Sequence, residues 1–202
     1  MADDDVEIPG LPIQYPAADI SPGQFENWVV EVLNAAGPQV EDLQVILHDR
    51  ISGVDGTYDL DATVRYRWAG MKFVVLVEAK LHSNPIRRDV VQVLHTKVQS
   101  VGAHKGVLIS TARFQKGAMT FAAAHGIALV HVTEERFTYV TRAVGPSPIL
   151  SREQAAELGL LPFIGYCYGP GDSSDSITVT AVGVDAPDNI AEVLLGVPSE
   201  RQ

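Results

Sequence analysis

The chain has 202 residues, of which 46% are hydrophobic and 20% are charged, and its formal net charge is −10. This length and composition are typical of a globular protein with one substantial core, and they exclude a wholly disordered chain. No apolar run is long enough to span a bilayer, so we expect no membrane contact.

The single cysteine and the N-terminus indicate where the protein works. One cysteine, Cys167, excludes an intramolecular disulfide and a cysteine-based zinc site, and we expect it to be a small buried hydrophobic residue. The N-terminal residues, MADDDVEIPG, lack the positive region and apolar core of a secretory signal. Both observations predict a cytoplasmic protein.

The charges are distributed unevenly along the chain. Residues 62–132 contain ten of the 15 Lys and Arg residues but only two of the 25 acidic ones, so this region carries about +8. The acidic net charge argues against a nucleic-acid partner, but a phosphate-contacting face needs only local positive potential. Nucleic acid therefore stays open as a partner.

The first predicted element is a helix that follows an acidic tail, residues 1–20, which we expect to be disordered. Ser21, Pro22 and Gln24 form a capping-box signature, and Gly37-Pro38 ends the helix near residue 36. Glu26 lies at the margin of the apolar stripe, from where it can reach inward. The alternative for Glu26 is a solvated helix acid.

Alternation and turn residues predict an antiparallel three-stranded meander next. Its strands are expected at residues 40–51, 58–68 and 71–79. Helical and strand patterns then alternate: a helix at 86–101, a strand at 105–110, a helix at 112–125 and a strand at 127–132. Right-handed crossovers would place the later strands parallel to the third. The core is therefore predicted to be a mixed α/β sheet.

The last third of the chain has a different character. We expect one more strand at 134–144, a short helix capped by Ser151, a strand at 177–184 and a last helix at 189–195. The predicted organisation is a tail at 1–20, a core at 21–135 and a C-terminal extension of unknown role at 136–202.

One stretch, residues 58–80, concentrates charged side chains at strand ends. Asp59 and Asp61 share one predicted face, and Glu78 and Lys80 share another at the end of an apolar strand. If the two strands pair, the carboxylates and the amine converge. Burying such groups is costly without a partner or a metal, which indicates a site. The spacing alone is a loose signal, because acids and lysines often lie at strand ends.

The order of elements around Asp61 and Glu78-Ala79-Lys80 resembles the Mrr-like branch of the PD-(D/E)XK restriction-endonuclease-like superfamily. The resemblance covers about residues 21–132, and includes QFENWVVEVLNAAG, DGTYDLD, VLVEAK, RRDVVQVL and KGVLISTARFQKGAMTFAAAHGIALV. It implies a restriction-endonuclease-like mixed β-sheet, α-βββ-α-β-α-β, flanked by helices. It also implies a Mg²⁺-dependent endonuclease that hydrolyses DNA phosphodiester bonds in restriction or DNA defence.

The resemblance also implies roles for individual residues. Asp61 matches the family's aspartate, and Glu78 and Lys80 match its Glu-x-Lys motif, with Ala79 as the small residue between them. Glu26 matches an acidic residue on the first helix of many members. Asp61, Glu78 and the Ala79 carbonyl would bind Mg²⁺, with Mn²⁺ as a substitute. Lys80 would orient or deprotonate the attacking water, and Glu26 would support the metal shell.

Two further residues and a second function stay open. Asp59 is an alternative to Asp61, and His82, two residues after Lys80, is a candidate phosphate contact. The same fold also suits a catalytically silent nucleic-acid-binding or sensor module, because overall acidity is unusual for a free-standing nuclease. A homodimer is expected, since cutting two strands needs two sites. Protein partners stay unknown from the sequence, which also does not specify DNA over RNA or any target sequence.

Overall fold

The computed structural model describes residues 18–142, 150–170 and 177–198. Residues 1–17 of the predicted tail lie outside this part of the chain. The elements follow in the order α1 (Pro22–Ala35), η1 (Gly37–Gln39), β1 (Glu41–Leu47), β2 (Arg50–Ser52), β3 (Thr57–Asp59), β4 (Ala62–Trp68), β5 (Met71–Lys80), α2 (Arg88–Val101), β6 (Lys105–Ser110), α3 (Lys116–His125), β7 (Ala128–Thr133), α4 (Glu135–Arg142), α5 (Arg152–Glu157), β8 (Ile164–Pro170), β9 (Ile177–Val182), α6 (Pro187–Ile190) and η2 (Ala191–Leu195).

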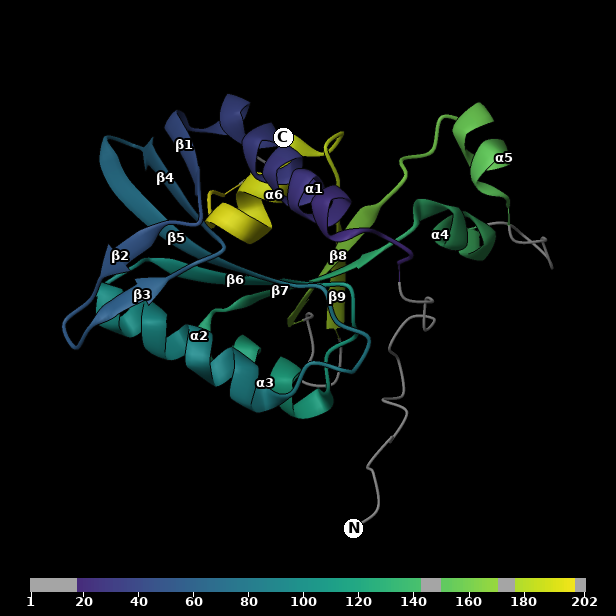
Figure 1. Ribbon diagram of the computed structural model, residues 1–202. Helices are drawn as coiled ribbons and strands as arrows, with labels where there is room; N and C mark the ends of the chain where they lie inside the picture. The colour runs from purple at the N-terminus through teal and green to yellow at the C-terminus, as the bar shows by residue number, and fades with distance from the viewer. Residues whose placement is uncertain (1–17, 143–149, 171–176, 199–202) are drawn as a thin grey trace, which may run out of the picture.

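Seven strands form one mixed sheet in the order β1-β4-β5-β6-β7-β8-β9. β1, β4 and β5 are antiparallel, β5, β6 and β7 are parallel, and β8 and β9 return antiparallel. Helices α1 and α6 cover one face of the sheet, and α2 and α3 cover the other (Figure 1). The predicted mixed α/β sheet flanked by helices is confirmed. Within the described ranges, no helix combines the length and apolarity needed to cross a membrane.

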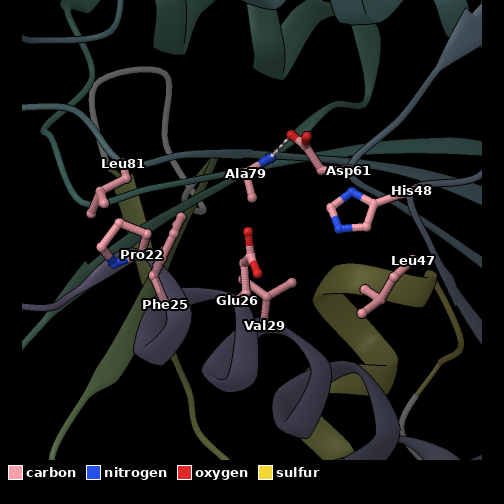
Figure 2. Close-up of a pocket in the computed structure, with 9 residues that line it drawn as sticks. All are labelled: Pro22, Phe25, Glu26, Val29, Leu47, His48, Asp61, Ala79 and Leu81. Atoms are coloured by element: carbon pink, nitrogen blue, oxygen red, sulfur yellow. Dashed lines mark hydrogen bonds between the residues drawn. The ribbon is translucent and has the colours of Figure 1, made fainter.

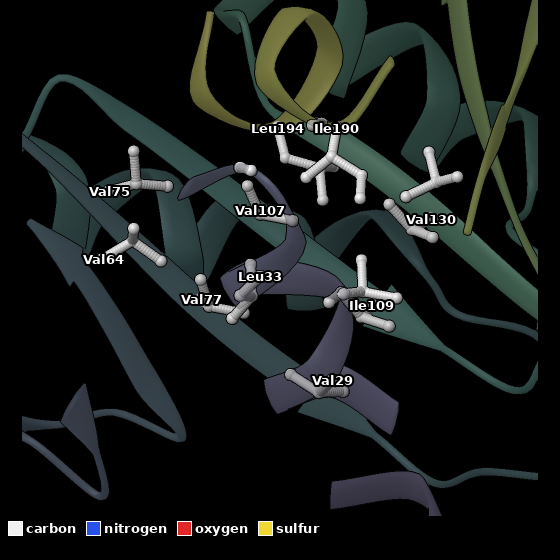
Figure 3. Close-up of a cluster of buried hydrophobic side chains, with 14 of the residues drawn as sticks. Val29, Leu33, Val64, Val75, Val77, Val107, Ile109, Val130, Ile190 and Leu194 are labelled. Carbon is white, nitrogen blue, oxygen red and sulfur yellow. The ribbon is translucent and has the colours of Figure 1, made fainter. Parts of the chain in front are cut away.

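The larger core lies between the sheet and α1. The predicted capping box starts this helix: the Ser21 hydroxyl accepts from the Gln24 amide at 3.3 Å, and the Gln24 side chain accepts from the Ser21 amide at 3.0 Å. The apolar stripe then packs on the strands together with α6 and η2 (Figure 3). The buried residues labelled there are Val29, Leu33, Val64, Val75, Val77, Val107, Ile109, Val130, Ile190 and Leu194. Burial of this apolar surface, at about 25 cal/mol per Å², stabilises the packing of α1 and α6 on the sheet.

The single predicted strand over residues 58–68 is wrong. The chain instead forms a separate two-stranded sheet, in which β2 pairs with β3, before β4 starts at Ala62. Gly53 donates to the Gly56 carbonyl at 2.7 Å and closes this hairpin. Leu60 interrupts the strand because it is buried, at 3% exposure, in the core on the α2 side.

The C-terminal third differs from expectation in two places. The predicted strand at 134–144 is wrong, because the chain forms α4, and a short alternating pattern does not distinguish a strand from an amphipathic helix. Strand β8 was not predicted, since its Gly-Tyr-Cys-Tyr-Gly-Pro composition is typical of a turn. The predicted Cys167 burial is confirmed, at 6% exposure on this strand.

The predicted domain boundary at residue 135 stays a prediction. Strands β8 and β9 continue the sheet from β7, and Val182, Ile190 and Leu194 belong to the same core as α1. We therefore propose that β8, β9, α6 and η2 complete the core that α1 and the preceding strands form.

Candidate active site

The site lies where β5 extends past its antiparallel neighbour. β4 begins at Ala62, opposite Val77, whereas β5 continues to Lys80 alongside β6. The carboxylate of Asp61 takes the place of a strand partner, and its Oδ2 accepts from the Ala79 amide at 2.7 Å. The amide and carbonyl of one strand residue project to the same edge, so the Ala79 carbonyl also faces this opening.

Glu78, Lys80 and Asp61 converge on one point at this open edge. The Lys80 ammonium lies 2.8 Å from Glu78 Oε2 and 3.5 Å from Asp61 Oδ2. Burial alone would lower the pKa of Lys80, but the hydrogen bond and charge of Glu78, with the charge of Asp61, outweigh it and raise the pKa. Lys80 is therefore an ammonium at neutral pH, placed between two carboxylates.

A second lysine, Lys97 on α2, also reaches Glu78. Its ammonium donates to Glu78 Oε1 and, at 3.3 Å, to the Asp59 carbonyl. The side chains of Lys97 and Glu78 are only 18% and 10% exposed. Sequence reasoning missed this residue, although Lys97 follows the buried Leu94 by three positions and so lies on the sheet-facing side of the helix.

A pocket of about 130 Å³ opens between α1 and the edge of β5. Figure 2 shows the Glu26 carboxylate pointing from α1 toward Asp61 and Ala79, with the His48 ring at the same pocket. His48 was not singled out from the sequence; it adopts φ 47°, and its amide donates to the Asp61 carbonyl at 2.9 Å. Glu26 therefore lies on the opposite wall from the Asp61 carboxylate.

The structure separates Asp59 from the other acids. Asp59 belongs to β3, its side chain is 85% exposed, and its Oδ1 lies 3.7 Å from Arg50 Nε. The prediction that Asp59 and Asp61 share one strand face is therefore wrong, because Leu60 and Asp61 lie in the break between two strands. Asp61, rather than Asp59, meets Glu78 and Lys80.

His82 continues the chain beyond β5 on the outside of the sheet. Its amide donates to Thr111 Oγ1 at 3.1 Å, and the Thr111 hydroxyl donates to the His82 carbonyl at 3.0 Å. The imidazole is exposed two residues beyond Lys80. A phosphate contact by His82 stays a prediction.

The donor set fits a hard divalent cation. The Lys80 ammonium already marks a position that both carboxylates can reach, and the Ala79 carbonyl faces the same opening. Among residues 18–142, 150–170 and 177–198, no three His, Cys, Asp or Glu side chains gather as a metal group. Mg²⁺ commonly takes only one or two carboxylates and keeps several waters, whereas zinc needs more nitrogen or sulfur ligands. The oxygen set therefore fits Mg²⁺ or Mn²⁺.

Comparisons with known proteins show which family the chain resembles, and the matched range includes the residues of this site. A family model, Mrr_cat, described as restriction endonuclease, matches residues 17–135. Among solved structures, a protein of unknown function, AF1548, is 16% identical with a TM-score of 0.43, covering 52% of this chain and 54% of that one. The DNA modification-dependent restriction endonuclease AspBHI is 16% identical with a TM-score of 0.36, covering 88% of this chain and 35% of that one. This chain thus spans about half and about a third of the two proteins. No curated protein matches it significantly.

Proposed function

The chain belongs to the Mrr-type restriction endonuclease family, and from this premise we propose that it is a Mg²⁺-dependent endonuclease that hydrolyses DNA phosphodiester bonds. The family generally uses divalent metal ions and acts on DNA. The observation that carries the proposal is the convergence of Asp61, Glu78 and Lys80 at the open edge of β5. A role in restriction or DNA defence follows from the family.

Asp61, Glu78 and the Ala79 carbonyl are the proposed ligands. Mg²⁺, or Mn²⁺ in its place, would offset the negative charge that gathers on the phosphate and would acidify the attacking water. Asp61 lies directly before β4 and Glu78 lies on β5, so the pairing of β4 with β5 sets the relative positions of the two carboxylates. Asp61 is further restrained by the Ala79 amide, which donates to its Oδ2.

The two lysines have different proposed tasks. Lys80, at 31% exposure, is the more accessible, and its ammonium is placed to hydrogen-bond a phosphate oxygen or the attacking water. Lys97 approaches Glu78 from α2 and holds the other carboxylate oxygen. When Lys80 turns to substrate, Lys97 stays as a cationic partner of the nearly buried Glu78 carboxylate.

Glu26 is proposed to act through water rather than as a direct ligand. It projects from α1 across the pocket toward Asp61 and Ala79 (Figure 2). An exposed carboxylate on this wall can accept hydrogen bonds from waters at the opening and orient them. A homodimer, which would bring two such sites to two strands, stays a prediction.

Plasmid cleavage tests this function directly. The purified protein should nick or cut DNA with Mg²⁺ or Mn²⁺ and should be inactive in EDTA. Lys80→Ala should abolish cleavage, whereas Lys72→Ala, an exposed lysine at the start of the same strand, should leave it intact. Equal cleavage by the wild type and Lys80→Ala would contradict the assignment. DNA binding without turnover, unchanged by Asp61→Asn, would instead favour a silent binding module.

A further inference from the structure

The segment between β5 and α2 is joined to the segment between β6 and α3. Ile86 forms a parallel bridge with Phe114. The Ile86 amide donates to the Arg113 carbonyl at 2.8 Å, and the Gln115 amide donates to the Ile86 carbonyl at 3.0 Å. These two connections, residues 81–87 and 111–115, are therefore held together at the carboxyl ends of the parallel strands, where open α/β sheets commonly bind ligands. We call them, with the first residues of α2 and α3, the ledge.

Alternation along this bridge directs basic side chains outward. Ile86 and Phe114 point into the core, at 2% and 6% exposure. Successive side chains in extended backbone face opposite ways, so their neighbours Arg87 and Arg113 face solvent, and both are exposed. The apolar pair thus anchors the ledge and presents two guanidinium groups on its outer side.

Two more cations stand at the adjoining helix starts. Arg88 is the first residue of α2 and Lys116 the first of α3, and both are exposed. A methyl group placed on Gly117 would lie only 3.9 Å from Arg88 Cβ, so the two helix starts abut. Neither helix has a side-chain cap, which leaves first-turn amides at the positive end of each helix without a side-chain acceptor.

The ledge carries a surplus of positive charge on an acidic protein. Residues 81–116 contain six Lys and Arg residues and one acid, Asp89, which lies 3.6 Å from Arg87 with both side chains well exposed, at 64% and 72%. Such exposed pairs are weak. The ledge starts directly after Lys80, and the seven residues to Arg87 span at most about 25 Å. Positive charge therefore continues outward from the candidate active site.

We propose that this basic ledge, formed by Arg87, Arg88, Arg113 and Lys116, binds the backbone phosphates of duplex DNA beside the bond that is cut. The inference rests on the proposed function, because it places substrate at the β5 edge. Arginine forks and uncapped helix amides match phosphate oxygens, and the ledge offers both together. Contacts of this kind position the duplex and carry no base specificity.

Salt-dependent DNA binding tests the ledge. The full chain carrying Arg87→Gln and Lys116→Gln would be titrated against a fluorescein-labelled 25-base-pair duplex in EDTA, by anisotropy from 50 to 300 mM KCl. Each lost phosphate contact should lower the slope of log affinity against log salt by about 0.9, so the double variant should lose about 1.8. This change of about 1.8 in slope corresponds to about 60-fold weaker binding near 0.1 M salt. The matched control is Arg67→Gln with Lys72→Gln, a cross-strand pair of cations at the far end of β5, which changes the net charge equally.

The outcomes separate the ledge from the nuclease. Equal affinity loss and equal slope change in both double variants, or displacement of the duplex by polyglutamate as efficiently as by unlabelled DNA, would overturn the ledge as a DNA site. Loss confined to the ledge variant would support it. If the ledge variant alone loses affinity but the wild type never cuts DNA with Mg²⁺, the proposed nuclease function is contradicted and the DNA-binding role of the ledge is supported. If the ledge variant binds and cuts DNA like the wild type, the DNA-binding role is contradicted and the nuclease function is supported.

Discussion

Replacing Glu134 with glutamine should remove a large part of the stability of the fold. Glu134 follows β7, and its side chain is 3% exposed. Its Oε2 accepts from Arg136 Nε at 2.8 Å and from Arg152 Nε at 3.0 Å. Arg152 also donates to Asp19, just before α1, at 3.1 Å. The carboxylate therefore joins three segments that are distant in the sequence.

The magnitude follows from the shifted ionisation of this group. Burial would raise the pKa of Glu134, but hydrogen bonds and charges from Arg152 and Arg136 outweigh it and lower the pKa from 4.5 to about 2. At 1.36 kcal/mol per pKa unit, ionised Glu134 contributes about 3 kcal/mol. Because the folded-state pKa is the lower one, this stability is complete above pH 4.5 and is lost as the pH falls toward 2.

Urea unfolding followed by tryptophan fluorescence measures this contribution. At pH 7, Glu134→Gln should lower the free energy of unfolding by about 3 kcal/mol, and its deficit relative to wild type should shrink as both are acidified below pH 4.5. Glu157→Gln, an exposed acid on α5, removes the same charge and should change stability by less than about 0.5 kcal/mol. A constant difference between wild type and Glu134→Gln from pH 7 to pH 3 would refute the reasoning.

Three further predictions concern the site and the single thiol. Asp61→Asn should abolish plasmid cleavage with a melting temperature near that of wild type, because the amide oxygen can still accept from the Ala79 amide, whereas Asp61→Ala should also cost about 1 kcal/mol in urea unfolding. Equal stabilities of the two variants would argue against a stabilising hydrogen bond between the Ala79 amide and the side chain at position 61. Lys97→Met should lower both cleavage and stability, because it removes one of the two cationic partners of the nearly buried Glu78 carboxylate. The free energy of unfolding should fall by about 1–3 kcal/mol. Lys97→Arg should restore part of both. Full activity of Lys97→Met would remove its positioning role. Burial raises the pKa of Cys167 to about 11, so at pH 8 its thiol should react with a disulfide reagent at least tenfold more slowly in the folded protein than in urea; similar rates would contradict that burial.

The sequence predicted best those site residues that lie on a single strand. An apolar run ending in Glu78 and Lys80 places both groups at a strand terminus, and the structure has them there. Strand alternation could not rank Asp61 over Asp59; the family resemblance favoured Asp61, and the physical reason is the break at the buried Leu60, which leaves no local pattern in the sequence. Identifying Lys97 as a site residue required knowing how the crossover places α2 against β5, because only tertiary structure brings positions 78 and 97 together.

The C-terminal elements were harder to predict from the sequence because tertiary packing also determines them. Strand β8 contains Gly165, where an added methyl group would lie 2.7 Å from Val130 Cγ1 and 2.9 Å from a Trp28 ring carbon. Close packing between β7 and α1 therefore requires a glycine there, and this residue obscures the strand pattern. Residues 134–142 carry charged and apolar residues in an order that fits both a strand and a helix, and the structure has the helix α4 there.

The hydrogen bond from the Ala79 amide to Asp61 has a consequence for how this fold can lose its activity. Asp61 completes the sheet as well as holding a proposed ligand position, so removing it would expose a main-chain amide as well as stop the chemistry. Lys80, at a partly exposed strand end, can be replaced at less structural cost. A descendant that turned into a pure binding protein would therefore be expected to keep aspartate or asparagine at position 61, because either side chain can accept from the Ala79 amide. Position 80 carries no such structural constraint and would be expected to vary more widely.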